Sequence, residues 1–187
     1  MIHVIKFVLE NQIHVLYLSP QSIATFEKKA LEDNILKNIT TFQVVAAKIG
    51  KTRSIVTRMS EEKVSTMLFQ EDVRKRVVPE LLKNFAENAL VLVFARATMR
   101  KLKELDVCHI RKLQEGMKSL GDEYIKSGID WLEVNKRAPC MEDSFSLVTW
   151  WKLGFEEQLF VWDRLKCATP LEVKSGMIIL LSGLQDQ

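Results

Sequence analysis

The chain has 187 residues, of which 47% are hydrophobic and 27% charged, and its formal net charge is +3. This is the composition of one globular domain and excludes a disordered or collagen-like protein. The cysteines, Cys108, Cys140 and Cys167, are too few and too scattered for a disulfide framework, so we expect a reducing, cytoplasmic setting. We expect no signal peptide, and no apolar run approaches the roughly 20 residues of a membrane span.

The charge is unevenly distributed along the chain. Residues 41–120 hold sixteen Lys and Arg against nine Asp and Glu, a net charge of +7, whereas residues 121–187 have a net charge of −4. A basic middle third beside an acidic end favours a polyanionic partner for the middle third.

The first forty residues predict a β-hairpin and a helix. The stretch HVIKFVLENQIHVLYLS, residues 3–19, alternates well enough for two strands that turn near Glu10 and Asn11. Ser19 and Pro20 supply an N-cap and a first-turn proline, so we expect a helix from there to about Asp33.

Helices are expected over most of the remaining chain. Thr40 and Gln43 have capping-box spacing ahead of the apolar stretch FQVVAAKI. Pro79 is expected to open a long apolar helix that reaches about Leu105, and Asp106 to cap the next helix. Two further helices are expected, an aromatic one over residues 145–165 and an apolar one that begins at Thr169 and Pro170.

The predicted fold class is therefore mainly α (α+β). A small N-terminal β-hairpin precedes a multi-helix body that contains a helix-turn-helix-like pair. We expect three regions: the hairpin and first helix (1–40), the helix-turn-helix-like segment (41–78), and a helical body for dimerisation or partner binding (79–187).

Apolar residues at alternating spacings of three and four form a heptad seam in the helix after Asp106. Its members are Ile110, Leu113, Met117, Leu120 and Tyr124, and Trp131 continues it one repeat later. The seam is either an internal packing face or a dimer contact.

The stretch VVAAKIGKTRSIVTRM, residues 44–59, carries the functional prediction. Its Gly50-Lys51-Thr52 resembles the end of a phosphate-binding loop, but that loop needs a glycine where the chain has Val45. A helix-turn-helix fits better, because Ala46 is small enough for a helix crossing and Gly50 can form the turn. Val56 and Met59 would then face the first helix.

This stretch resembles the helix-turn-helix of bacterial DNA-binding regulators, especially that of ParB-type partition proteins. The resemblance implies that the second helix enters the major groove of DNA. The residues expected to bind nucleic acid are Lys48, Lys51, Thr52, Arg53, Ser54, Thr57 and Arg58.

We therefore expect a non-enzymatic, cytoplasmic DNA-binding regulator. Recognition of paired operator sites favours a dimer. The alternative is a helical scaffold subunit of a larger assembly without nucleic-acid binding. In either case Trp150 and Trp151 are candidates for a protein contact, because adjacent helical residues point about 100° apart.

No catalytic set and no cofactor are expected. Cys108 and His109 are adjacent, but the closely spaced ligand pairs that zinc prefers are missing from the sequence. The histidines have no nucleophile beside them in a known catalytic arrangement. No membrane partner is expected.

Overall fold

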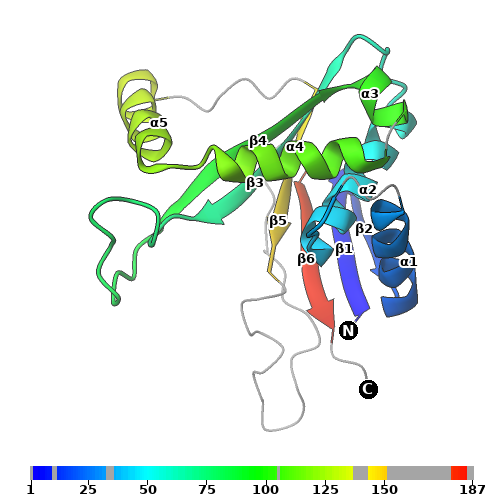
Figure 1. Ribbon diagram of the computed structural model, residues 1–187, viewed down its shortest axis with the longest axis horizontal. Coiled ribbons are helices and arrows are strands. Elements are labelled where there is room, and N and C mark those ends of the chain that lie inside the picture. Colours follow the sequence, from blue (N-terminus) through cyan, green and yellow to red (C-terminus); the bar gives the residue numbers. More distant parts are fainter. Residues whose placement is uncertain are drawn as a thin grey trace, which may run out of the picture.

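The computed structural model of the protein describes residues 2–9, 12–32, 36–104, 106–136, 143–150 and 178–184. Pairs of strands are separated by groups of helices along these residues (Figure 1). The strands are β1 (Ile2–Leu9), β2 (Gln12–Leu18), β3 (Val64–Asp72), β4 (Leu90–Thr98), β5 (Ser144–Thr149) and β6 (Ile178–Leu184). The helices are α1 (Pro20–Leu31), α2 (Thr41–Val56), α3 (Met99–Glu104), α4 (Asp106–Lys118) and α5 (Asp122–Asn135).

The strands form one mixed six-stranded sheet in the order β2-β1-β6-β5-β3-β4. β3, β5 and β6 are parallel to one another, whereas β1 pairs antiparallel with β2 and β6, and β4 pairs antiparallel with β3. The N-terminal hairpin that the alternation predicts is present, but it extends this sheet through β6 instead of standing as a small separate unit.

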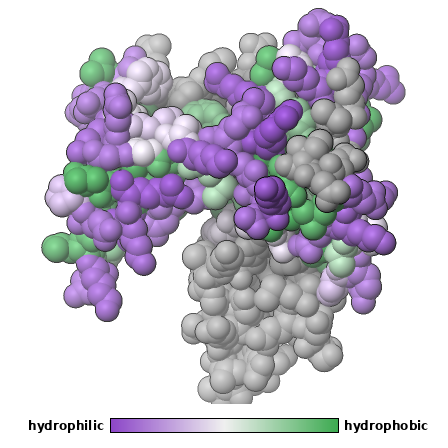
Figure 2. Space-filling model, viewed as in Figure 1, coloured by the Kyte–Doolittle hydropathy of each residue, from purple (hydrophilic) through white to green (hydrophobic). Residues whose placement is uncertain are grey.

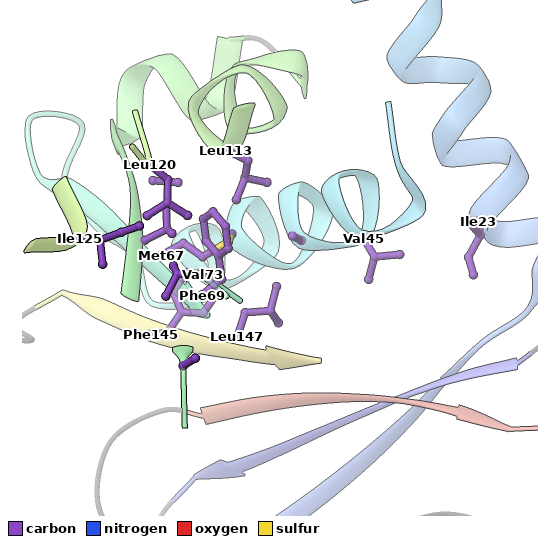
Figure 3. Packing of buried hydrophobic residues seen from close by; sticks show 14 residues of the cluster. Ile23, Val45, Met67, Phe69, Val73, Leu113, Leu120, Ile125, Phe145 and Leu147 are labelled. Atoms are coloured by element: carbon purple, nitrogen blue, oxygen red, sulfur yellow. The ribbon is translucent and has the colours of Figure 1, made fainter. Parts of the chain in front are cut away.

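Helices α1, α2 and α4 lie over one face of the sheet (Figure 1). The main core fills the space beneath α2 and α4. Phe69, Met67 and Phe145 from the sheet meet Leu113 from α4 and Val45 from α2, and all five are at most 1% exposed (Figure 3). Burial of such large apolar side chains is the main force that holds the helices on the sheet.

The expectation of a mainly α fold is wrong. The region from Pro79 to about Leu105, predicted to be one helix, contains a loop, strand β4 and helix α3. The sequence of β4, LVLVFARAT, is apolar on both faces of the strand, and Phe94 on the far face is itself half-buried. Although only Val93, Ala95 and Ala97 of this strand are buried, its apolar residues on both faces remove from the sequence the alternation that distinguishes a strand from a buried helix.

The C-terminal helices were predicted wrongly for the same reason. The expected aromatic helix over residues 145–165 begins as strand β5, in which Phe145 and Leu147 face the core. The apolar residues 178–184, expected to continue the last helix, form strand β6. The rest of both predicted helices lies outside the described residues.

The helix-turn-helix is also absent from the described segment 41–56. α2 is one continuous helix of 16 residues, and Gly50 lies inside it without a turn. Gly50 serves close packing: a Cβ atom there would lie 2.7 Å from His109 Nε2 and 2.9 Å from Met67 Cε. Val56, expected to face an inner angle between two helices, is 73% exposed.

Helix starts were predicted correctly where capping residues mark them. Ser19 accepts a hydrogen bond from Ser22 N at the start of α1, with Pro20 in the first turn. Thr40 and Gln43 form the expected capping box of α2. These local interactions do not depend on which elements pack nearby, so they can be predicted from the sequence.

The heptad seam is divided between two helices. Ile110, Leu113 and Leu120 are buried in the core, while the chain leaves the helical conformation between α4 and α5. Trp131, further along α5, is 44% exposed. The α4 half of the seam is thus an internal packing face. No described helix is long and apolar enough to cross a membrane. The division into regions at residues 40 and 78 stays a prediction.

The close contact at Gly50 predicts a sharp difference between two glycines. Gly50→Ala forces His109 or Met67 to move and should lower the free energy of unfolding by about 1 to 3 kcal/mol. Gly128→Ala in α5 meets no atom within 4 Å and should be neutral or stabilising by up to about 1 kcal/mol. Urea unfolding of both variants measures this. Equal effects at the two positions would show that α2 and α4 are not in close contact at Gly50.

Candidate functional site

The residues expected to bind nucleic acid are distributed around α2 and do not form one exposed surface. Ser54 is fully buried, and its hydroxyl donates to Gly50 O at 2.9 Å and lies 3.1 Å from Ser65 Oγ. Thr57 donates its hydroxyl to Arg53 O at 2.9 Å. Lys48 lies over the ring of Phe26, with Nζ 5.3 Å from the ring centre. Lys51 is half-buried, whereas Thr52 and Arg58 are exposed.

Arg53 connects the C-terminal half of α2 to the start of β5. Its Nη1 and Nη2 atoms donate to the carbonyl oxygens of Asp143 and Ser144, each at 3.3 Å. Its guanidinium carbon lies 5.1 Å from the ring centre of Phe145. Burial lowers the pKa of Arg53 from its ordinary value, and the negative charge of Asp143 opposes that shift. Arg53 therefore has a structural position against the sheet.

Trp150 and Trp151 follow the end of β5. Trp150 is half-buried and has an interaction partner, so its ring is not freely exposed. Trp151 lies outside the described residues. Their proposed role in a protein contact therefore stays a prediction.

His109 lies where α4 crosses α2. It is 4% exposed, and its ring fills the space above Gly50. Burial lowers the pKa of His109 to about 4, and the nearby positive charge of Lys51 adds to the shift. His109 is therefore neutral at pH 7 and acts as part of the helix contact.

The carboxyl ends of β3, β5 and β6 lie together at one edge of the sheet. The register pairs Phe69 with Leu147 and Thr149 with Leu181, so the three parallel strands end side by side. The first turn of α2 lies over this edge, because the ring centre of Phe42 is 5.6 Å from that of Phe69. In sheets with parallel strands, ligands bind at this end of the strands. We call this edge the crevice edge.

Polar side chains hold the N-terminus of α2 at the crevice edge. The buried Gln43 accepts hydrogen bonds at Oε1 from Thr40 N at 3.2 Å and from Gln114 Nε2 at 3.3 Å. Gln114 also donates to Asn38 O at 2.8 Å. Thr41 donates to Glu27 Oε1 of α1 at 2.9 Å. The helix end is thus fixed from two neighbouring helices, and the carboxylate of Glu27 lies beside it.

His109 does not belong to the crevice edge. It contacts Gly50, which lies nine residues, or about 13 Å along α2, from Thr41 at the edge. No group of three or more potential metal ligands occurs among the described residues. The capping box of Thr40 and Gln43 is the one feature of this edge that the sequence reveals, and by itself it predicts only where a helix starts. The role of Gln114 could not be inferred without the fold.

A family model with the description "Transferase family" matches residues 4–183. The chain belongs to this family. Among its curated relatives, the Acyltransferase GLAUCE of Arabidopsis thaliana is 33% identical over 172 residues, which are 88% of this chain and 38% of the relative. The Omega-hydroxypalmitate O-feruloyl transferase of Arabidopsis thaliana is 27% identical over 90% of this chain and 38% of its own length.

Solved structures with low sequence identity share the fold. Vinorine synthase superposes with a TM-score of 0.64 at 19% identity, over 95% of this chain and 40% of that protein. TRI101 of F. graminearum, in complex with coenzyme A and T-2 mycotoxin, gives a TM-score of 0.70 at 13% identity over 96% of this chain and 42% of that protein. The chain therefore spans about two fifths of the length of the relatives that it matches.

Membership of the transferase family overturns the regulator hypothesis. The match covers nearly the whole chain, whereas the ParB resemblance covered one short segment, and that segment is a single helix. The predictions of DNA as a partner and of a non-enzymatic protein are wrong, since the relatives are acyltransferases. The scaffold alternative is also unsupported. The expected dimer rested on paired operator sites and loses that basis.

Arg53 should contribute to stability through its two carbonyl contacts. Arg53→Met keeps the aliphatic part of the side chain but removes both hydrogen bonds, so we expect the free energy of unfolding to fall by about 1 to 3 kcal/mol. Arg58→Met, at an exposed position, should change it by no more than about 0.5 kcal/mol. Chemical denaturation compares the two. A result in which Arg58→Met is the more harmful variant would contradict the assignment.

His109 should make the protein less stable in mild acid. In the unfolded chain His109 takes up a proton near pH 6.5, whereas in the folded chain its pKa is about 4. The free energy of unfolding should therefore fall as the pH drops from 6.5 to 4, by up to about 3 kcal/mol, and this contribution should stay constant outside that window.

The matched variant for this measurement is His109→Gln, which removes the titrating group. It should flatten the stability profile between pH 6.5 and 4. Asp72 and Asp122 have lowered pKa values because of hydrogen bonds donated by Arg74 N and Lys126 Nζ, so the loss of stability at lower pH should persist in both proteins. Parallel profiles of the two proteins down to pH 4 would rule out a buried neutral His109.

Proposed function

We propose that the protein transfers an acyl group from a coenzyme A thioester to a hydroxyl or amine acceptor. In this reaction the acceptor atom attacks the thioester carbonyl carbon, the C–S bond breaks, and the acceptor's proton leaves with the free thiol of coenzyme A. The family match over residues 4–183 is the observation that carries the proposal.

The names of the relatives support this reaction class. They include a Fatty alcohol:caffeoyl-CoA acyltransferase of Arabidopsis thaliana, 25% identical over 75% of this chain, and an Anthranilate N-benzoyltransferase of Dianthus caryophyllus, 29% identical over 65%. These names combine aromatic acyl groups with alcohol or amine acceptors. We accordingly infer an aromatic acyl group as the moiety transferred, and a cytosolic location in keeping with the free, buried Cys108.

We assign coenzyme A binding by this chain to the crevice edge. The N-terminus of α2, held in place by Gln114 and Glu27, provides a fixed polar surface for one end of the ligand. The ends of β3 and β5 provide strand backbone beside it, where a ligand can lie extended across the sheet edge. The role that we assign to the described residues of this edge is to position the ligand.

A coenzyme A titration tests this assignment directly. Addition of coenzyme A to the isotopically labelled chain should shift the backbone amide NMR signals of residues 40–43 and 148–150. Thr40→Ala removes the helix cap, so it should weaken the shifts and lower stability by about 1 kcal/mol. Thr57→Ala, at the other end of α2, should leave the shifts unchanged. Shifts confined to other residues would refute the crevice edge as the binding surface.

A further inference from the structure

A second surface hollow lies at the opposite end of β3 from the crevice edge. It has a volume of about 550 Å³ and is lined by Val64, Thr66, Arg96, Ala97, Thr98, Lys101 and Lys112. These residues come from the start of β3, the end of β4, α3 and α4. Since β4 is the outermost strand of the sheet, the hollow lies along the sheet's edge. We call it the β4 groove.

The lining of the β4 groove is cationic. Arg96, Lys101 and Lys112 bring three positive charges to it, and its lining contains no carboxylate. Lys112 forms an ion pair with Glu115. Among the residues that the structure describes, no carboxylate forms an ion pair with Arg96 or Lys101, so their charges are available to a ligand. The neighbouring Arg100 and Lys103, by contrast, are paired with Glu61 and Glu62.

The edge of β4 adds backbone hydrogen-bonding groups to the groove. Tyr124 Oη donates to Leu92 O at 3.2 Å, so Leu92 turns its backbone groups away from β3. In an antiparallel strand every second residue does the same. Arg96 and Thr98 therefore also face outward, whereas Met99 faces inward and donates its N–H to Lys63 O at 2.9 Å. Both N–H and C=O groups consequently point into the groove.

The polar lining of the groove agrees with the character of the helix side of the molecule. Most of this face is hydrophilic (Figure 2). Within the groove, Val64 and Ala97 give a small apolar surface beside the hydroxyl groups of Thr66 and Thr98. The volume lies within the range of about 300 to 1,000 Å³ that is typical of small-molecule sites.

We propose that the β4 groove binds an organic phosphate. The two cations without a carboxylate partner, Arg96 and Lys101, and the hydroxyls of Thr66 and Thr98 can donate to the phosphate oxygens, which are good acceptors. The outward carbonyl groups of β4 can also accept hydrogen bonds from the several hydroxyl or amino groups of an organic part, and these additional contacts favour an organic phosphate over inorganic phosphate. The site is separate from the crevice edge, because Val64 begins β3 and the crevice edge is where β3 ends. It does not depend on the proposed acyl transfer.

An alternative explanation is that these positive charges protect the edge strand β4 from pairing with other chains. Lysine and arginine at an edge strand prevent pairing with other sheets, and such charges need no ligand. This explanation predicts weak, non-saturable attraction of any anion. Variants should then lose affinity according only to how many positive charges they lack. Specific binding predicts saturation. The loss of affinity should then depend on which positive charges are removed.

Isothermal titration of the chain with adenosine diphosphate and with inorganic pyrophosphate distinguishes these explanations. We expect saturable binding of adenosine diphosphate at one site, at least tenfold tighter than pyrophosphate and weakened by added salt. Arg96→Ala combined with Lys101→Ala should reduce its affinity at least tenfold. Arg100→Ala combined with Lys103→Ala removes the same charge outside the groove and should reduce it less than threefold.

Several results would overturn the proposal. They are non-saturable binding, equal losses in the two double variants, and equal affinity for pyrophosphate and adenosine diphosphate. Displacement of adenosine diphosphate by a tighter-binding acidic peptide would assign the groove to a protein partner instead. Arg96 and Lys101 are exposed, so both double variants should fold, and circular dichroism checks this. The coenzyme A shifts at residues 40–43 should persist in the groove variant, which separates this test from that of the crevice edge.

Discussion

The close approach of α2 to α4 and β3 at Gly50 is the contact on which the helical layer depends. The missing side chain at Gly50 lets the ring of His109 and the methyl group of Met67 fill the same small space. From this point α2 extends in both directions along the sheet. Its C-terminal half reaches the start of β5 through Arg53, and its N-terminus reaches β3 through the contact of Phe42 with Phe69. This one glycine therefore determines how closely α2 lies against α4 and β3.

A similar close approach places α4 on β4. A Cβ atom at Gly116 would lie 2.9 Å from Phe94 O, so only glycine allows the helix to come this near to the strand. α4 thereby covers the edge of β4 at Phe94, and Tyr124 of α5 covers it at Leu92. The edge stays accessible at Arg96 and Thr98, which is where the β4 groove lies. The position of a glycine in one helix thus determines which part of the sheet edge is available.

Local features such as helix caps could be predicted from the sequence, whereas the tertiary contacts could not. Ser19, Thr40 and Gln43 form the expected caps because each acts within three residues of itself. β4 and β6 were assigned to helices because strands in the middle of a sheet, or partly covered at its edge, are apolar on both faces. The basic segment around Lys51 suggested nucleic acid, yet Arg53 and Ser54 are held by contacts with the sheet. Such contacts join residues up to 91 positions apart, and no short pattern contains them.

The pairing of β1 with β6 has a consequence for how the chain reaches its final structure. Ile2 lies opposite Leu184, so the first and last strands of the described chain are neighbours near the middle of the sheet. Until β6 is in place, the hairpin β1–β2 has no strand to join it to β5, and the sheet consists of two separate halves. Closing so large a loop is entropically unfavourable and puts such contacts late in folding. During this interval β1 and β5 each have an unpaired edge that can pair with another chain. The order in which the strands assemble therefore affects aggregation as well as folding.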